Sequence, residues 1–247
     1  MSLLSFQKVS FAYPKGEEIL KDISFDIGEN ERVALLGLNG AGKSTLMLHT
    51  NGLLIPQKGR VMVENFSTDS KKEIKEIRKI VGMVFQNPDD QLFMPEVWDD
   101  VAFGPRNMNL DEEEIERRVA KAMLMTRTLE LAHKSPFELS GGQKKSVSIA
   151  TVLSMSPRIL IMDEPTSGLD YEATRNFIEL IESLFGLEAK NGGNRIDNDK
   201  VPAEELRSLL LSTHDMVLAR RLCTRALIIK EGRLIYDGPL VSAPYPD

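Results

Sequence analysis

Residues 37–45 read Gly37-Leu38-Asn39-Gly40-Ala41-Gly42-Lys43-Ser44-Thr45. The apolar run at 33–36 before them is typical of a buried strand, and residues 46–49 after them favour the first turns of a helix. A strand, a glycine-rich turn ending in Gly-Lys-Ser and a helix together predict a phosphate-binding loop. A glycine-rich surface turn is the alternative, and the flanking strand and helix weigh against it.

The residue types in this loop suit phosphate chemistry. Glycines let successive backbone N–H groups converge on a phosphate without Cβ clashes, and the helix N-terminus adds the positive end of its dipole. Lys43 supplies a mobile positive charge for the β- and γ-phosphates, and the Ser44 hydroxyl is a suitable Mg²⁺ ligand. The residues expected to contact the phosphates are Gly37, Asn39, Gly40, Ala41, Gly42, Lys43, Ser44 and Thr45.

The bulk properties narrow the class of protein. A chain of 247 residues with 42% hydrophobic content suits one large α/β domain with a subdomain. The net charge of -6 argues against a nucleic-acid partner. The single cysteine, Cys223, excludes a disulfide framework and suits a reducing compartment, where we expect it to fill core space. Neither a signal peptide nor an apolar run of about 18 residues is evident, so any membrane link is expected to run through a partner.

Two carboxylates follow a second apolar strand. Residues 159–162 are all apolar and lead into Asp163 and Glu164. Ligands of open α/β sheets bind at such strand ends. We therefore expect Asp163 to hold Mg²⁺ and Glu164 to accept a proton from the water that attacks the γ-phosphate. Two solvated charges are the alternative, which the buried strand before them disfavours.

Three further polar or aromatic residues have two interpretations each. His214 ends a strand at 209–214, where a functional role is favoured over a structural one. Gln86 ends a strand at 81–85 and either reaches Mg²⁺ and the attacking water or caps the strand. Tyr13, in the first turn, either stacks on a purine base or packs at a sheet edge.

The middle of the chain is predicted to be helical. Helices are expected at residues 70–79, 111–121, 144–153 and 171–185. Leu139-Ser140-Gly141-Gly142-Gln143 comes just before the third of these and forms either a second anion cradle or a helix cap with flexible glycines. A second cradle is useful only if the chain meets a second copy of itself or a relative. Residues 186–205 predict a solvated surface excursion.

From residue 6 to residue 238 these motifs closely resemble the ATP-binding subunit of an ABC transporter. Residues 37–44 resemble the Walker A loop, and residues 159–163 resemble Walker B. The remaining motifs, in chain order, are the adenine-stacking aromatic Tyr13, the Q-loop residue Gln86, the signature residues 139–143, the catalytic Glu164, the D-loop residue Asp170 and the switch histidine His214.

The resemblance implies a fold and a site. The fold is α/β, a P-loop NTPase with a RecA-like core, an antiparallel β subdomain and an inserted helical subdomain. A single domain over residues 1–247 would have its core at about 1–86 and 155–238 and its helical subdomain at about 87–154. The implied catalytic residues are Glu164, His214, Gln86 and Lys43, and the implied Mg²⁺ ligands are Ser44, Gln86 and Asp163. ATP would contact Tyr13, the loop residues given above, and Ser140, Gly141, Gly142, Gln143 and Asp170.

A subfamily is also implied. Residues 86–93 and 99–105 resemble the energy-coupling-factor and cobalt/nickel importer ATPases, which take up transition-metal ions or vitamins. Such subunits pair as homo- or heterodimers, with ATP between one subunit's Walker A loop and the other's signature. They lie peripherally at the cytoplasmic face of the cell membrane, under a transmembrane coupling protein and beside a substrate-binding membrane component. The chain departs from the pattern at Trp98, at Lys145-Ser146 and at residues 186–205, none of which is a motif residue.

Three rival functions remain. A soluble ABC ATPase of DNA repair or translation carries long coiled coils or tandem cassettes, and this chain has neither. A P-loop kinase or GTPase has no need of the signature at 139–143 or of a switch histidine. A non-catalytic ATP-binding scaffold is disfavoured by the presence of Glu164 and His214.

Overall fold

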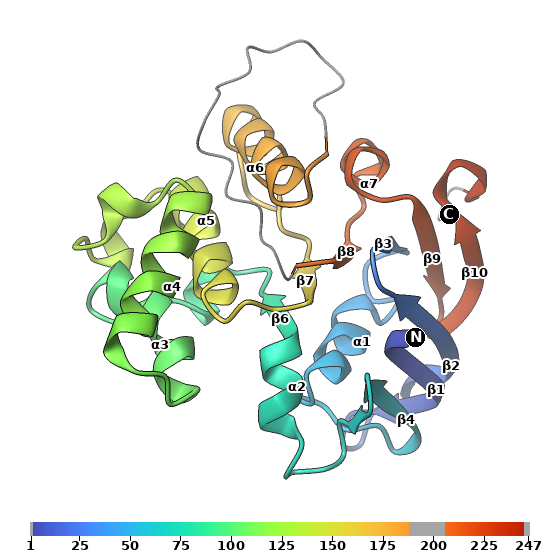
Figure 1. Cartoon of the computed structure of the whole chain (residues 1–247). Helices are drawn as coiled ribbons and strands as arrows, with labels where there is room; N and C mark the ends of the chain where they lie inside the picture. Colours follow the sequence, from blue (N-terminus) through green and yellow to red (C-terminus); the bar gives the residue numbers. More distant parts are fainter. Residues whose placement is uncertain (1, 188–205, 245–247) are drawn as a thin grey trace. The chain divides into compact units, whose positions relative to one another are not determined.

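The computed structural model describes residues 2–187 and 206–244, which form two compact units (Figure 1). The first unit contains residues from Met1–Met83, Arg158–Glu164 and Arg207–Asp247. The second contains residues from Val84–Pro157 and Pro165–Leu206. Most of the surface excursion expected at 186–205 lies outside the described residues, because the description stops at residue 187 and resumes at 206.

A four-stranded antiparallel sheet with the order β2-β1-β4-β5 belongs to the first unit. Its strands are β1 Ser2–Ala12, β2 Glu18–Gly28, β4 Lys58–Val63 and β5 Phe66–Ser67. The strands β1, β2 and β4 lie side by side in Figure 1, with helix α1 (Lys43–Thr50) next to them. This sheet is the antiparallel β subdomain expected from the sequence.

A six-stranded sheet has the order β10-β9-β3-β8-β7-β6. Its strands are β3 Arg32–Leu36, β6 Val81–Val84, β7 Ile159–Asp163, β8 Ser208–Ser212, β9 Arg225–Lys230 and β10 Arg233–Pro239. The strands β9, β3, β8 and β7 are parallel, and every residue of β7 and β8 is buried. The carboxyl ends of β3, β7 and β8 therefore share one edge, which receives the phosphate loop, Glu164 and His214.

Three α-helices complete the first unit as described: α1, α2 (Ile74–Ile80) and α7 (Met216–Leu222). The helix expected at residues 70–79 begins only at Ile74. Glu73 accepts a hydrogen bond from the Ser67 amide at 2.6 Å, and the Glu73 amide donates to the Ser70 carbonyl, so the preceding residues form turns. Cys223 is buried in this unit, as expected, and burial raises the pKa of its thiol to about 12.

The second unit is helical. Its α-helices are α3 Val97–Asn107, α4 Glu112–Met125, α5 Gly141–Leu153 and α6 Tyr171–Leu184. Short 3-10 turns lie at Pro88–Asp90, Leu129–Leu131 and Pro136–Glu138 in this unit, and at Leu240–Ser242 in the first. The helices α3, α4 and α5 contact one another, and α6 contacts α5. The second unit also takes in the described residues of Pro165–Leu206, whereas the core was expected at about 1–86 and 155–238, and those domain boundaries stay a prediction.

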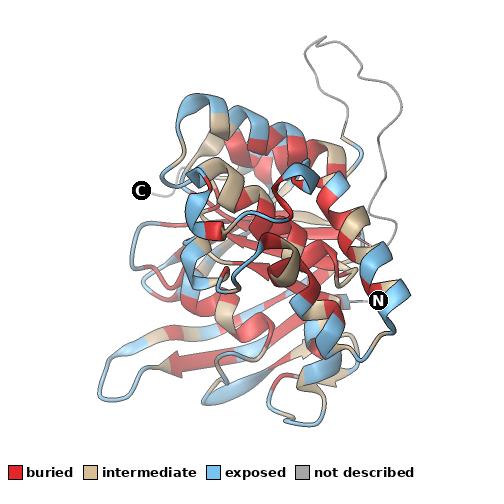
Figure 2. Ribbon diagram, turned by 90° about the vertical axis from the view of Figure 1, so that its left-hand side faces the viewer, coloured by how far each residue is buried: buried red, intermediate tan, exposed pale blue. Residues whose placement is uncertain are grey.

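Burial follows the hydrophobic pattern of the sequence. Figure 2 shows the strands mostly in the buried colour and the helices buried along one side and exposed along the other. In α4, for example, Ile115, Val119 and Met123 are buried while the acidic residues of the first turn are not. The helices are thus held by packing of an apolar stripe rather than by intrinsic propensity alone.

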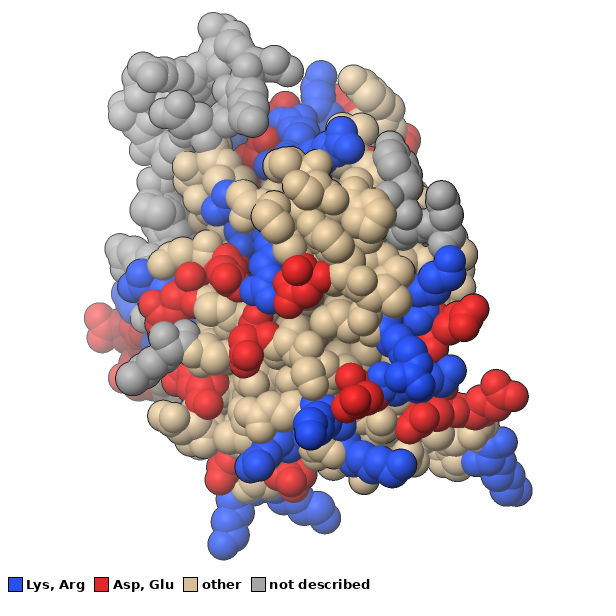
Figure 3. Space-filling view, turned by 90° about the vertical axis from the view of Figure 1, so that its right-hand side faces the viewer, with Lys and Arg blue, Asp and Glu red and all other residues tan. Residues whose placement is uncertain are grey.

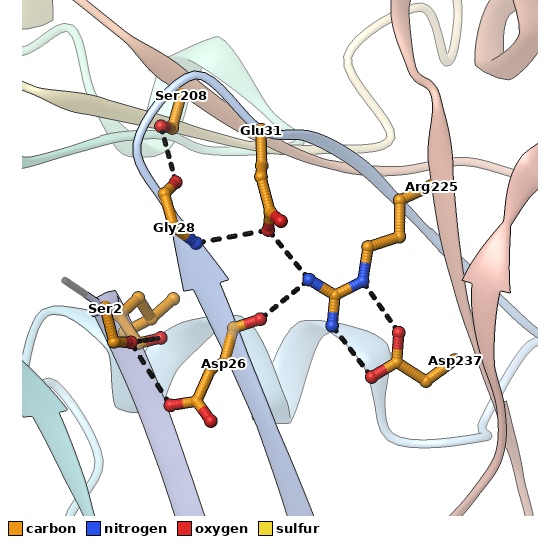
Figure 4. A network of polar contacts seen from close by, with 8 residues as sticks. Ser2, Asp26, Gly28, Glu31, Ser208, Arg225 and Asp237 are labelled. Atoms are coloured by element: carbon orange, nitrogen blue, oxygen red, sulfur yellow. Dashed lines mark hydrogen bonds and ion pairs between the residues drawn. The ribbon is translucent and has the colours of Figure 1, made fainter.

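An arginine joins both sheets of the first unit (Figure 4). Arg225 of β9 donates to both carboxylate oxygens of Asp237 on β10, at 2.7 and 2.8 Å. It also donates to Glu31 at 2.7 Å and to the backbone carbonyl of Asp26 on β2 at 2.9 Å. Glu31 in turn accepts from the Gly28 amide at 3.1 Å. The carboxylate of Asp237, and after it that of Glu31, raises the pKa of Arg225. The hydrogen bonds together fix the β9–β10 hairpin against the end of β2.

Charged side chains elsewhere on the surface are mixed in sign. On the face drawn in Figure 3, Lys and Arg are interspersed with Asp and Glu around uncharged stretches. Among the described residues, no helix is long and apolar enough to cross a membrane.

Candidate functional site

The loop between β3 and α1 has the backbone shape that its glycines permit. Gly37 has a φ of 150°, and a Cβ there would overlap the carbonyl oxygen of Ile229. Gly42 is the N-cap of α1 with a φ of 105°, in the left-handed region, and makes no side-chain capping bond. The first turn of α1 contains no acidic residue. Its orphan N–H groups are therefore not capped by a side chain, as a phosphate-binding helix start requires.

Lys43 is held close to this loop by backbone carbonyls. Its Nζ atom donates to the carbonyl of Gly37 at 2.8 Å and to that of Leu38 at 3.3 Å. The side chain is only 7% exposed, and Nζ lies 3.8 Å from Oε1 of Glu164. The structure thus brings the loop lysine and the carboxylate after β7 together, as the shared strand edge predicts.

The end of β7 carries a polar cluster. The Asp163 carboxylate is 6% exposed and accepts a hydrogen bond from the Ser212 hydroxyl. Glu164 has a φ of 41°, and its amide lies 3.1 Å from both the carbonyl and the hydroxyl oxygen of Ser212. A non-glycine residue in this left-handed region is uncommon and tends to occur at functional sites.

His214 faces Glu164 across this edge. Its Nδ1 atom donates to Oε2 of Glu164 at 2.9 Å, since a carboxylate can only accept. The imidazole is 75% exposed, whereas Glu164 is 12% exposed. The other carboxylate oxygen, Oε1, is buried without a hydrogen-bond partner in the described part of the chain. Glu164 therefore retains a free acceptor lone pair beside Lys43.

Ser212 is a site residue that the sequence analysis missed. It pairs in register with Asp163 across β7 and β8 and bonds both Asp163 and the Glu164 amide. The available signal was a polar residue directly after the apolar run at 209–211, two residues before His214. Without strand order, that signal does not say which neighbour the hydroxyl meets.

Tyr13 lies just past the end of β1 and is 40% exposed. Its hydroxyl lies 3.4 Å from the Thr45 hydroxyl on α1, and its ring packs edge-on against Phe11 at 5.1 Å. The structure therefore places this aromatic beside the phosphate loop with part of its ring open.

The remaining candidate residues belong to the second unit. Ser140 is the N-cap of α5, where its hydroxyl accepts from the Gln143 amide at 3.3 Å and its own amide donates to the Gln143 side chain at 3.0 Å. This capping box starts the helix at Gly141, three residues before the expected start at 144. The helix cap is therefore present at Ser140, and the use of this helix start as a second anion cradle stays a prediction.

Asp170 and Gln86 are also engaged within this unit. Asp170 caps α6 by accepting from the Ala173 amide at 2.8 Å. The backbone carbonyl of Gln86 accepts a hydrogen bond from Lys145, and Lys144 pairs with Asp89 at 2.6 Å. The first turn of α5 is therefore tied to the segment that follows β6. The functional roles of all these residues stay predictions.

The donor set near the loop suits a magnesium ion with a phosphate ligand. The Ser44 hydroxyl and the Asp163 carboxylate are hard oxygen donors. Within residues 2–187 and 206–244 there is no group of three or more His, Cys, Asp and Glu that could hold a metal alone. A Mg²⁺ ion there would depend on phosphate oxygens, as is usual for this ion.

Comparison with known proteins gives consistent matches. A model of the ABC transporter family matches residues 20–167. The energy-coupling factor transporter ATP-binding protein EcfA of Methanocaldococcus jannaschii is 40% identical over 239 residues, which is 96% of this chain and 79% of that protein.

Two solved structures are similar over nearly the whole chain. The structure of cbiO1 from Clostridium perfringens, described as part of the ABC transporter complex cbiONQ, has a TM-score of 0.79 at 38% identity, covering 97% of this chain and 89% of that one. The ATP-binding cassette MJ0796, a dimer in a post-hydrolysis state bound to ADP and Pi, has a TM-score of 0.78 at 26% identity, covering 96% and 98%.

Proposed function

The chain belongs to the ABC transporter family as an ATP-hydrolysing subunit, and we propose that it powers an energy-coupling-factor importer for cobalt or nickel ions or a vitamin. The observation that carries the proposal is the cluster of Lys43, Glu164 and His214 at the shared strand edge. The likeness to EcfA and to cbiO1 supports the importer class. The resemblance of residues 86–93 to cobalt/nickel importer ATPases supports the cargo class.

Each residue at the site of the first unit has its own proposed role in hydrolysis. The backbone of the phosphate loop and Lys43 bind the β- and γ-phosphates and offset the negative charge that develops during phosphoryl transfer. Glu164 orients the attacking water and accepts its proton at a carboxylate oxygen. His214 holds Glu164 through Nδ1, and its second proposed role is to contact the γ-phosphate. Gln86, which belongs to the second unit, is proposed to link hydrolysis to that unit.

Magnesium would be held by Ser44 and Asp163, with Gln86 as a further oxygen donor. When bound, the ion supplies positive charge to the phosphate oxygens. Ser212 keeps Asp163 in place, because its hydroxyl donates to that carboxylate. The hydrogen bond to Asp163 explains why the Ser212 hydroxyl is buried at the end of β8.

A second subunit completes the proposed site. The exposed N-terminus of α5, with Ser140, Gly141 and Gly142, is a second anion cradle that one chain does not use alone. In the proposed dimer it faces the γ-phosphate bound by the partner, so ATP joins the subunits and hydrolysis releases them. The dimeric state of the similar cassette MJ0796 supports this part of the proposal.

An exposed aromatic pair is the proposed contact for the transmembrane coupling protein. Phe93 and Phe103 are 60% and 42% exposed, and their rings meet edge to face at 5.0 Å. Large exposed apolar side chains that pack together are more often binding surfaces than isolated ones are. Both lie in the helical unit, near the segment after Gln86, so a docked membrane helix could act on the Q-loop.

The deciding experiment measures ATP turnover and cargo uptake together. The chain is reconstituted in vesicles with the transmembrane coupling protein and the substrate-binding component of its own organism, and cobalt, nickel and vitamin uptake are measured with ATP. We expect uptake of one cargo that requires ATP, and ATP turnover that depends on the membrane proteins. Turnover that the membrane proteins leave unchanged, without uptake, would favour a soluble ABC ATPase instead.

A further inference from the structure

His49 is a fully buried histidine on α1, six residues after Lys43, and no part of the proposed hydrolysis uses it. Its Nδ1 atom donates to the carbonyl of Thr45 at 2.7 Å, and Nε2 has no hydrogen-bond partner among the described residues. An apolar side chain would fill the same space without burying an unpaired nitrogen. Core filling alone therefore does not explain a histidine here.

The contacts of the ring lead to Tyr13. The imidazole packs edge to face against Phe11 at 4.8 Å with an interplanar angle of 80°. Phe11 packs in the same way against Tyr13 at 5.1 Å and 85°. Such aromatic pairs are directional, so the orientation of each ring depends on the previous one.

A second set of contacts, through Thr45, also connects His49 with Tyr13. Thr45, whose carbonyl accepts from His49, has its hydroxyl 3.4 Å from the Tyr13 hydroxyl. The bond from Nδ1 to Thr45 fixes the imidazole over the first turn of α1, and burial lowers the pKa of His49, which keeps the ring neutral with its hydrogen on Nδ1. Phe11 is buried too, so among these rings only that of Tyr13 is open to a ligand.

We propose that His49 is a positioning residue for the nucleotide base: its ring holds Phe11, and Phe11 holds Tyr13 in the orientation that stacks on adenine. The inference rests on the proposed function, because Tyr13 matters here only if it contacts the base. Histidine suits the position because it combines a hydrogen-bond donor, which locks the ring, with an aromatic edge.

Two substitutions separate the hydrogen-bond donor of His49 from its aromatic ring. His49→Asn keeps a donor near the Nδ1 position but removes the ring, whereas His49→Phe keeps a ring and removes the donor. The equilibrium affinity of the full chain is measured for Mg-ATP and for Mg-tripolyphosphate, which has no base. We expect His49→Asn to weaken ATP binding by about two- to tenfold, the size of one aromatic contact, and to leave tripolyphosphate binding unchanged. His49→Phe should bind ATP more tightly than His49→Asn.

A double-mutant cycle tests whether His49 affects ATP binding through Tyr13. In a Tyr13→Ala background the effect of His49→Asn on ATP affinity should disappear, because the ring that it orients is gone. An equal loss in both backgrounds, or an equal loss for tripolyphosphate, would overturn the inference by showing general damage to α1. If the His49 variants do not fold, Phe11→Leu, which keeps a buried apolar side chain but removes the ring, tests the step from Phe11 to Tyr13. Unchanged ATP affinity in this variant would also overturn the inference.

The outcomes distinguish this inference from the proposed function. If Tyr13→Ala leaves ATP affinity unchanged, the base site and this inference both fail, while hydrolysis at Glu164 stands. If the parent chain binds neither ATP nor tripolyphosphate, the proposed function itself fails. If Tyr13→Ala weakens ATP binding and His49→Asn does not, only this inference is overturned.

Discussion

Nδ1 of His214 lies 2.9 Å from Oε2 of Glu164, and the other carboxylate oxygen of Glu164 lies 3.8 Å from Nζ of Lys43. One carboxylate thus lies between a histidine that orients it and a lysine that belongs to the phosphate loop. This arrangement suits a group that positions water next to a bound phosphate.

Replacing Glu164 with glutamine should separate binding from hydrolysis. Glu164→Gln keeps the size and a hydrogen-bond acceptor but cannot take a proton, so we expect Mg-ATP affinity to be preserved and turnover to fall by about a hundredfold or more. Phosphate release and equilibrium ATP binding are the two measurements. Glu116→Gln, an exposed change on α4, serves as the control. Turnover within about tenfold of the parent would show that Glu164 is not the base.

The anion cradle proposed at the start of α5 should be needed for dimerisation but not for ATP binding by one subunit. Ser140→Arg fills the start of α5 with a long cation, so we expect ATP binding to persist and the ATP-dependent dimer to be lost. Size-exclusion chromatography in the Glu164→Gln background, with and without ATP and Mg²⁺, reports the dimer. Ser135→Arg, at the cap of the preceding 3-10 turn, is the matched control. An undiminished dimer in Ser140→Arg would rule out the shared site.

The Arg225 network should contribute substantially to stability. Arg225→Ala leaves Asp237 and Glu31 without their shared partner at a site where the arginine side chain is only 23% exposed. We expect the free energy of unfolding in urea to fall by about 2–3 kcal/mol. Arg106→Ala removes an ion pair with Asp99 whose arginine is 45% exposed and should cost under about 1 kcal/mol. Equal costs for the two variants would show that the network adds nothing beyond a surface pair.

The sequence predicted the fold class and most of the candidate site, but it missed features that depend on contacts between residues distant in the chain. The fold class was predicted correctly through the resemblance of the motifs to ABC transporter ATPases, and the observed strand order brings Gly37, Glu164 and His214 to one sheet edge. The role of Ser212 was missed, because it depends on which strand lies beside β7. The start of α5 was placed three residues late, because two glycines lower helix propensity and a capping box overrides that tendency. The late start of α2 accompanies two hydrogen bonds that the helical pattern does not reveal: the Ser67 amide donates to the Glu73 carboxylate, and the Glu73 amide donates to the Ser70 carbonyl.

Burial of His49 should make stability depend on pH. Its pKa is lowered in the folded state, so the unfolded chain binds more protons at this residue when the pH falls below its ordinary value of about 6.5. The stabilising contribution is complete above that pH and is lost progressively as the pH falls toward the lower folded pKa. Between pH 7.5 and 5.5 we expect His49→Phe to lose less stability than the parent, by up to about 1.4 kcal/mol. Urea unfolding at several pH values measures this difference. The two remaining histidines are exposed and are present in both proteins, so parallel pH curves would show that His49 carries no such linkage.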